Sequence, residues 1–379
     1  MSDLTREDLD LLRDTAARFF EEQLPVGSLR ELRDERDETG FDRGRWREMA
    51  EMGWAGILIG EDDGGIDFGY TALGTIMEQS GRTLAASPLV STVLLGAPLI
   101  ASAGSTAQRE RILSSVATGE QLLALAHEEG RRHAPHQVST RAARHGNRFV
   151  INGSKTFVLD GHVADQFIVV ARTDGEDNAP AGLSLFLVAA DTPGIRCSRT
   201  TMVDGRNAAN IEFEQVEIAA DALVGAPERG FKVLEPVLDR ARAGLAAEML
   251  GTGLEAFDRT IEYLKVREQF GVKIGSFQAL KHRAAEMYCE IELTRSATYA
   301  ALAAIDADLA EVAELASVAK AKACEMIELV SNEAVQMHGG IGMTDEADIG
   351  LYLKRARVSQ QILGDALYHR ARYATLIGI

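Results

Sequence analysis

Near the C-terminus, the stretch QILGDALYHR contains one carboxylate, Asp365, directly after Gly364. We predict that the Gly364–Asp365 step is a loop between the last two helices, so helical periodicity does not fix where Asp365 points. A carboxylate in such a place could act as a general base. Its reference pKa, about 3.9, is low for that task, so burial would have to raise it. The alternative is an N-cap for the helix ALYHRARYATL, and one Asp can serve both purposes.

Other common chemical motifs do not occur in the sequence. The three cysteines, Cys197, Cys289 and Cys324, are far apart and odd in number, which favours a reduced protein without a disulfide framework. No Cys/His/Asp cluster has metal-ligand spacing, so no metal site is predicted. Neither GxSxG nor GxGxxG is present. His338 and His369 are predicted to be structural hydrogen-bond donors rather than catalysts.

The elements that would position such residues fall into three zones, and the predicted class is α+β. Residues 1–120 read as an N-terminal helical domain, 121–228 as a middle antiparallel β-domain, and 229–379 as a C-terminal bundle of helices. In the middle zone, Asn152-Gly153 within RFVINGSKTFVLDG predicts a β-hairpin. In the last zone, the apolar stripes of 243–265, 276–304, 311–337 and 346–376 predict antiparallel packing.

Composition narrows the class of protein. The chain has 379 residues, of which 46% are apolar, and a net charge of −17. That charge argues against nucleic-acid binding, because no basic excess is present to displace counterions from phosphates. No apolar h-region opens the chain and no stretch reaches about 18 apolar residues, so we expect a cytoplasmic protein without a membrane span.

Four segments carry a family resemblance: EMGWAGILIGEDDGGIDFG (51–69), NGSKTFVLDGHVADQFIVVART (152–173), KVREQFGVKIGSFQALKHRAAEM (265–287) and QMHGGIGMTDEADIGLYLKRAR (336–357). Together they span nearly the whole chain, and their sequences and order resemble those of the acyl-CoA dehydrogenase family. Within the family, the sequence motifs look most similar to those of heteromeric members, such as small subunits of pimeloyl-CoA dehydrogenases and dehydrogenases of steroid side chains. The resemblance therefore implies a role in lipid or steroid catabolism.

The resemblance implies a fold, a cofactor and partners. The fold is an N-terminal helical domain, a middle β-domain and a C-terminal four-helix bundle, assembled as a homo- or heterotetramer. The cofactor is FAD, the substrate an acyl-CoA thioester, and the electron acceptor a protein such as an electron-transfer flavoprotein. In the α,β-dehydrogenation, a carboxylate removes the α-proton, hydrogen-bond donors stabilise the enolate-like oxygen, and the flavin takes the β-hydride.

In the family each FAD lies across a subunit interface, and one half of its site comes from the neighbouring bundle. That half is retained here. The resemblance assigns FAD contacts to Arg267, Phe270, Gln278, Gln336, Gly339 and Gly340. An arginine suits pyrophosphate, and glycines allow the backbone to approach it. The alternative is that Arg267 is a surface ion-pair residue and the glycines are a helix C-cap.

The other half, from the middle domain, departs from the family. The usual Thr-Glu-Pro-x-x-Gly-Ser-Asp run is replaced by HEEGRRHAPH (127–136), in which only Glu129 is in place. Leu159 stands where a threonine would contact the flavin, although Phe157 could still pack on the ring. Glu128, Arg131, Arg132 and His133 are either a replacement set or, as we favour, an exposed charged loop.

Both usual positions of the family's base also lack a carboxylate. Leu363 aligns with the common Glu, and Ala241 with the alternative position on the first long helix of the bundle. Asp365 is therefore the candidate base. Asp239 lies two residues before Ala241, which turns its side chain to the opposite helix face. We assign Asp239 and Arg242 to contacts with the CoA substrate instead.

These features leave several functions open. The chain is an FAD-dependent acyl-CoA dehydrogenase with Asp365 as base, or a non-catalytic partner subunit that supplies half of the FAD site in a heteromeric enzyme. An oxidase of the same fold with an Asp base is a further alternative. A protein that has lost the flavin and serves only assembly is disfavoured, because the Arg267 and Gln336 motifs are intact.

Overall fold

The computed structural model describes residues 4–379, and the chain divides into two units. The first contains residues 32–69 and 86–241, and the second contains residues 4–31, 70–85 and 242–379. Helix α7 (Gly230–Val266) begins in the first unit and continues in the second. The boundary predicted near residue 120 lies inside the first unit, and the three-domain division stays a prediction.

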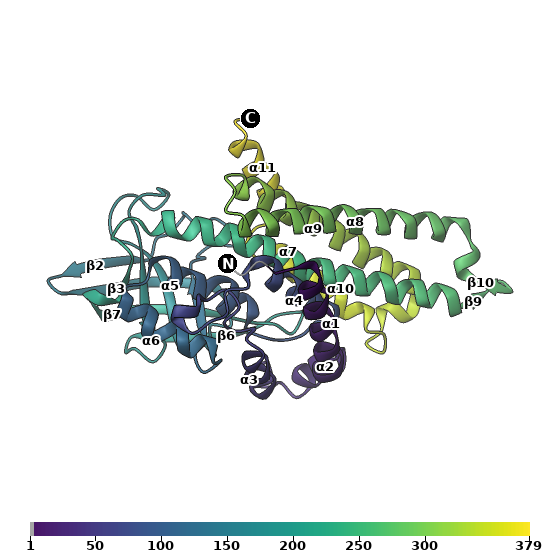
Figure 1. Cartoon of the computed structure of the whole chain (residues 1–379), viewed down its shortest axis with the longest axis horizontal. Coiled ribbons are helices and arrows are strands. Elements are labelled where there is room, and N and C mark those ends of the chain that lie inside the picture. The colour runs from purple at the N-terminus through teal and green to yellow at the C-terminus, as the bar shows by residue number, and fades with distance from the viewer. Residues whose placement is uncertain (1–3) are drawn as a thin grey trace. The chain divides into compact units, whose positions relative to one another are not determined.

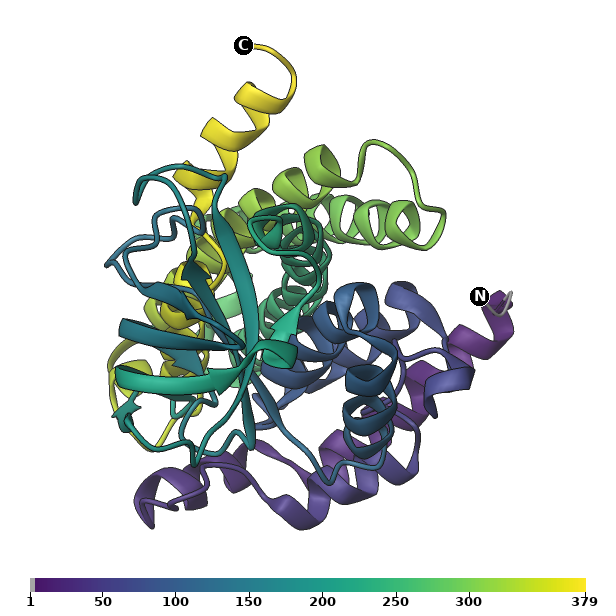
Figure 2. The same cartoon turned by 90° about the vertical axis from the view of Figure 1, so that its left-hand side faces the viewer.

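A twisted eight-stranded sheet is the centre of the first unit (Figure 2). Its strands are β1 (Leu123–Ala126), β2 (Arg141–His145), β3 (Arg148–Leu159), β4 (Gln166–Arg172), β5 (Leu183–Ala189), β6 (Ile195–Thr201), β7 (Asn207–Ala219) and β8 (Leu223–Val224). They follow the order β6-β7-β3-β2-β4-β5-β8, with β1 beside β4. All neighbours are antiparallel except β1 with β4 and β2 with β4.

The predicted hairpin at Asn152-Gly153 is wrong. Strand β3 runs through both residues, and its pairing with β7 shifts register between Ile151 and Gly153, which is a β-bulge. Gly153 has φ +144°, and a Cβ there would lie 2.6 Å from the Thr140 hydroxyl, so only glycine fits. The turn itself is at 146–147, where His145 of β2 pairs with Arg148 of β3. A bulge and a tight turn use the same residue types, so the pair Asn-Gly did not distinguish them.

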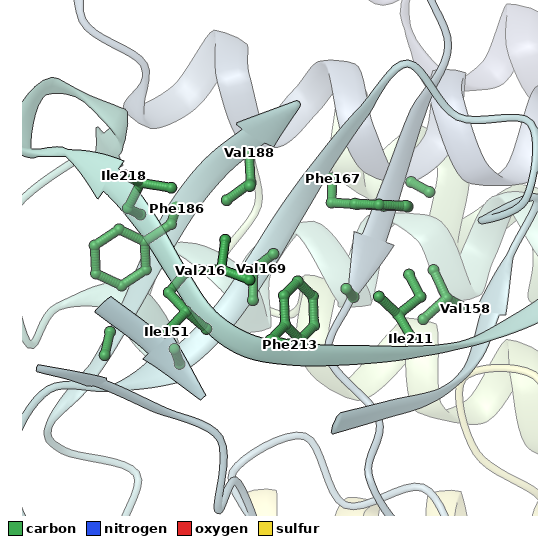
Figure 3. Packing of buried hydrophobic residues seen from close by; sticks show 14 of the residues in the cluster. Ile151, Val158, Phe167, Val169, Phe186, Val188, Ile211, Phe213, Val216 and Ile218 are labelled. Atoms are coloured by element: carbon green, nitrogen blue, oxygen red, sulfur yellow. The ribbon is translucent and has the colours of Figure 1, made fainter. Parts of the chain in front are cut away.

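Alternating apolar residues of β3, β4, β5 and β7 point to one side of the sheet and form its core (Figure 3). Phe149 and Phe186 lie with ring centroids 5.0 Å apart in this cluster. The apolar stretch ASPLVSTVLLGAPLIASAG (86–104) forms a buried helical segment: the π-helical turns η2 (Leu89–Gly96) are fully buried and continue into α5 (Ala97–Ala103). The remaining helical elements of this unit are α3 (Arg43–Glu51), η1 (Glu61–Asp63), α6 (Thr106–Ala117) and η3 (Ala220–Ala222).

The second unit is helical, with long helices running side by side (Figure 1). After α7 come α8 (Gln278–Asp306), α9 (Val312–His338), α10 (Ile349–Gln361) and α11 (Ala366–Leu376); α1 (Arg6–Gln23) and most of α2 (Val26–Asp34) and α4 (Gly69–Arg82) complete the unit. Helix α9 packs against α8, α10 and α11. A small hairpin of β9 (Glu268–Gln269) and β10 (Val272–Lys273) is followed by η4 (Ile274–Ser276), and η5 (Gly339–Met343) follows α9.

The predicted fold class is confirmed: helices at both ends of the chain, a central sheet, and a C-terminal bundle of several helices. The run 346–376 is divided by the loop 362–365, as the Gly364–Asp365 step predicted. Within residues 4–379, no helix is both long enough and apolar enough to cross a membrane.

Candidate functional site

Asp365 is the N-cap residue of α11. Its Oδ1 accepts a hydrogen bond of 2.8 Å from the backbone N–H of Tyr368, and the side chain is partly exposed. The two residues before it have left-handed backbones, with φ +58° at Leu363 and +101° at Gly364. A Cβ on Gly364 would lie 2.5 Å from the Tyr368 ring, so this position requires glycine. The N-cap role is therefore confirmed, and the role of Asp365 as base stays a prediction.

Three fully buried side chains hold the loop that carries Asp365. The Lys320 ammonium donates to the carbonyl oxygens of Gly364 (2.8 Å) and Ser359 (3.2 Å). His369 Nε2 contacts the Leu363 carbonyl at 2.9 Å. Burial lowers the pKa of Lys320 from its usual value, an effect that Cys324 and Asp365 oppose. The loop backbone is thus fixed from inside the bundle, and the last carbonyls of α10 are satisfied by a cation.

Arg242 is the third of these groups, and it belongs to the substrate contacts expected from the sequence. It is fully buried, its Nε lies 3.4 Å from the Leu363 carbonyl, and its guanidinium lies 5.6 Å from the centre of the Tyr368 ring. These contacts give Arg242 a structural role. Asp239, also on α7, is buried as well. Substrate binding by either residue stays a prediction.

The two residues that the resemblance places at the usual base positions are both apolar and buried. Leu363 is 4% exposed, and Ala241 is fully buried in α7. Neither residue can accept a proton. Within this chain, Asp365 is accordingly the nearest carboxylate to the position of the family's common base in sequence.

The residues expected to contact a neighbour's flavin are exposed on the second unit, around the β9–β10 hairpin seen at one end of the bundle (Figure 1). Phe270, at the tip of this hairpin, is 91% exposed. The exposed side chain of Arg267 makes no ion pair among residues 4–379, so the structure gives no support to the alternative of a surface ion pair. Gln278 and Gln336 are exposed too.

The glycines of this region leave space for an outside group. Gly339 has φ +66° and ends helix α9, so the C-cap alternative is correct for it. A Cβ on Gly271, Gly339 or Gly340 would meet no atom within 4 Å. Packing within the chain therefore does not demand glycine at Gly340, whereas close approach of an external phosphate would. The exposed cation, aromatic ring and open backbone fit the pyrophosphate and ring of FAD.

The middle-domain half of the expected site is apolar where the family has a hydroxyl. Phe157 is half-buried with φ +52°, and Leu159 is half-buried beside it. Glu129, the one residue of the run 127–136 that the resemblance matches to the family, accepts from the buried Lys155 ammonium at 2.7 Å. Burial lowers the pKa of Lys155 to about 8, against the opposing effect of Glu129. This pair anchors the segment that follows β1 to strand β3.

A cluster of three titratable side chains also lies here, which the sequence did not predict. The Glu128 carboxylate contacts the imidazoles of both His127 and His133. Burial would raise the pKa of Glu128, but the two histidines outweigh burial and lower it. The expectation of an exposed charged loop is correct for Arg131 and Arg132 and wrong for Glu128 and His133. No local signal in HEEGRRHAPH shows that the loop folds back to bring His133 onto Glu128.

The remaining histidines near the expected site have structural contacts. His338 Nδ1 contacts the Ala334 carbonyl at 2.7 Å, and its ring stacks on Tyr263 with centroids 4.4 Å apart. His369 holds the Leu363 carbonyl, as described above. Both contacts agree with the structural role expected from the sequence.

Comparison with known proteins gives three domain matches. They are described as acyl-CoA dehydrogenase N-terminal domain (residues 6–120), middle domain (123–216) and C-terminal domain (228–375). The chain is 30% identical to the probable acyl-CoA dehydrogenase YngJ of Bacillus subtilis, over 86% of this chain and 87% of YngJ. It is similar to the solved Tcur3481-Tcur3483 steroid ACAD, with a TM-score of 0.88, 32% identity and 98% of each chain covered. It is also similar to the ChsE4-ChsE5 complex from Mycobacterium tuberculosis, with a TM-score of 0.89, 27% identity and 100% of each chain covered.

Proposed function

The chain belongs to the acyl-CoA dehydrogenase family, and from that membership we propose that it is a subunit of an FAD-dependent acyl-CoA dehydrogenase that completes the flavin site of a neighbouring subunit. Members of this family are flavin-dependent oxidoreductases. Bound FAD would supply hydride acceptance at the β-carbon of an acyl-CoA thioester. Arg267 and Gln336 would hold the cofactor, and Phe270 would cover it.

One observation carries this proposal: the residues of the bundle that the resemblance assigns to flavin contacts are exposed in the described part of the chain. Arg267 has no ion-pair partner among residues 4–379, and Phe270 exposes 91% of its surface. The exposed ring of Phe277 lies 6.2 Å from that of Phe270, and a joined apolar surface of this kind marks a binding site. Val266 and Met343, which are also exposed, add to the apolar surface of this region.

The second observation concerns the chain's own active site. Leu363 and Ala241 occupy the two base positions, and Leu159 replaces a flavin-contacting hydroxyl. A chain that keeps the half-site it gives to a neighbour, while its own half-site is altered, is suited to a heteromeric enzyme, a heterotetramer in the cytoplasm. The self-sufficient alternative would be a homotetramer. The similarity to the ChsE4-ChsE5 complex supports assembly with a second, different subunit. The similarity to a steroid ACAD supports a lipid or steroid acyl group. An electron-transfer flavoprotein is the acceptor that the family resemblance implies.

A second candidate, a self-sufficient dehydrogenase with Asp365 as base, has one favouring observation. The N-cap hydrogen bond uses Oδ1 of Asp365. Among residues 4–379, no hydrogen-bond donor contacts Oδ2, so a proton acceptor is available on a partly exposed side chain.

The FAD content of the purified protein separates the two candidates. The chain is expressed alone, purified, and analysed for FAD per chain by its visible spectrum, with assembly state measured by light scattering. We expect FAD well below one per chain, restored by co-expression with a family partner encoded nearby. Full occupancy and turnover of an acyl-CoA by the chain alone would overturn the partner-subunit proposal in favour of the second candidate.

A further inference from the structure

We propose that His127, Glu128 and His133 form a binding site for a divalent transition-metal ion, for which Zn²⁺ has the best-matched chemistry. Two imidazole nitrogens and one carboxylate oxygen are ligand types that Zn²⁺ takes readily. The three ligand atoms all lie within 4.8 Å of one another. This inference rests on the chain's own side chains and does not depend on the proposed flavin function.

One distance within the cluster is close to the separation that a tetrahedral metal would impose on two ligand atoms. His127 Nε2 lies 3.1 Å from Glu128 Oε1, and His133 Nδ1 contacts the same oxygen. Zinc bonds to nitrogen and oxygen are about 2.0–2.2 Å long, so tetrahedral ligand atoms lie roughly 3.3–3.5 Å apart. Small movements of these side chains would therefore bring the ligand atoms to the separations of a tetrahedral zinc site. Three protein ligands leave a fourth position for water or another small donor.

Burial supports a ligand at this place. The side chains of His127, Glu128 and His133 are only 8%, 11% and 3% exposed. Both ring nitrogens of His127, Nδ1 and Nε2, are buried and have no hydrogen-bond partner in the described part of the chain. An unpaired polar atom in a protein interior calls for a specific cause. A metal ion bound at Nε2 would give that buried nitrogen the partner that the described part of the chain does not provide.

The backbone that carries two of the ligands is fixed by strand β3. The Thr156 N–H donates to the Glu128 carbonyl at 2.8 Å, and the Lys155 ammonium donates to the His127 carbonyl at 3.2 Å. The charge of Lys155 would oppose a nearby cation, but its ion pair with Glu129 reduces that effect. Rigid support of this kind is what a metal site needs. The exposed residues Gly130 and Arg131 give solvent access next to the ligands.

The competing arrangement is a metal-free cluster in which both imidazoles donate N–H groups to the Glu128 carboxylate. Zinc binding distinguishes the two arrangements, because the metal site binds one Zn²⁺ per chain and the hydrogen-bonded cluster does not. The protein, as purified with or without its flavin, is freed of metal by dialysis against a chelator. It is then equilibrated with one equivalent of ZnCl₂ and passed through a gel-filtration column. Zinc per chain is measured by mass spectrometry, and the affinity for Zn²⁺ by competition with a chromophoric chelator.

We expect about one zinc per chain for the unaltered protein and for His136→Ala, a histidine of the same loop whose ring packs on Phe231 instead. Glu128→Gln and His133→Ala should each weaken zinc binding at least about tenfold, because each removes one of three ligands. Circular dichroism of the metal-free proteins checks that the variants fold, and the near-isosteric Glu128→Gln guards against loss of structure. Absence of stoichiometric zinc in the unaltered protein, or equal loss in His136→Ala, would overturn the site in favour of the hydrogen-bonded cluster.

Discussion

The ammonium group of Lys320 lies 2.8 Å from the carbonyl oxygen of Gly364, with the lysine fully buried in helix α9. This contact ties the short loop before α11 to the centre of the bundle. The candidate base, Asp365, is the next residue along the chain. The position of Asp365 is therefore fixed in two ways, by the Lys320 ammonium that holds the loop backbone and by the N-cap hydrogen bond of Asp365 itself. Substitution of each residue separates the two effects.

Lys320→Met should destabilise the second unit. The methionine fills similar space but leaves the carbonyls of Gly364 and Ser359 buried without a donor, at a cost of roughly 2–4 kcal/mol in the free energy of unfolding. Urea unfolding followed by circular dichroism measures this loss. Lys322→Met is the control on the same helix, because Lys322 pairs with Glu290 near solvent and should change stability by less than about 0.5 kcal/mol. Equal stability of the two variants would contradict the anchoring role.

Substitution of Asp365 separates capping from proton abstraction. Asp365→Asn keeps an oxygen that accepts from the Tyr368 N–H and should leave stability nearly unchanged, whereas Asp365→Ala should cost about 1 kcal/mol. If Asp365 is the base, both variants lose exchange of the α-proton of a bound acyl-CoA, which NMR in deuterated buffer measures in a flavin-loaded assembly. If the partner carries the base, Asp365→Asn retains that exchange. Retained exchange would remove the self-sufficient candidate.

Phe270→Ser should weaken flavin binding without weakening the fold of the chain. Since Phe270 is 91% exposed, its removal costs almost no burial within the chain. The flavin held together with a neighbouring subunit would lose an aromatic contact, and we expect roughly tenfold weaker FAD binding, about 1.4 kcal/mol. FAD titration of the assembled protein measures the change. Leu11→Ser removes an apolar side chain that is 67% exposed on α1 and is the control expected to bind FAD normally. An equal effect of both would indicate general destabilisation.

The sequence predicted the parts of the fold and site that depend on local patterns. Helical stripes, the break at Gly364 and the N-cap at Asp365 rest on periodicity and backbone preference, and the structure contains each of them. The hairpin predicted at Asn152-Gly153 was wrong, because a β-bulge and a hairpin turn need the same backbone freedom. The contacts of Lys320 were beyond local reasoning, because its carbonyl partners lie about forty residues later in the chain. A lysine in a helix has no local feature that distinguishes it from a surface residue.

The folding of His133 onto Glu128 was hidden for a related reason. The loop between them has charged, exposed residues, and those dominate its composition. The loop is closed by tertiary contacts. Ser139 and Thr140 donate their N–H groups to the Glu129 carboxylate, and Lys155 of β3 donates to the same carboxylate. Side-chain pairing across a loop of this length leaves no periodic signal.

Asp160 gives a stability change with pH whose direction follows from its pKa. The carboxylate lies next to Leu159 and accepts a hydrogen bond of 2.5 Å from the Ser91 hydroxyl. Burial raises its pKa to about 6, against the opposing effects of Ser91, Arg206 and Asn207. The folded state therefore binds more protons than the unfolded chain between about pH 4 and pH 6. The free energy of unfolding contributed by this group falls as pH rises through that range and is constant above it.

Asp160→Asn removes this titration while keeping the side-chain shape. Asparagine tolerates the left-handed backbone of the site, φ +54°, and its oxygen can still accept from Ser91. The variant should match the unaltered protein near pH 4 and exceed its free energy of unfolding by up to about 2 kcal/mol at pH 7.5. Urea unfolding at several pH values measures the difference. Asp177→Asn, at an exposed pair with Arg141, is the control and should show a difference below about 0.5 kcal/mol throughout. A difference between Asp160→Asn and the unaltered protein that stays constant from pH 4 to pH 7.5 would show that Asp160 is ionised in the folded protein over the whole range.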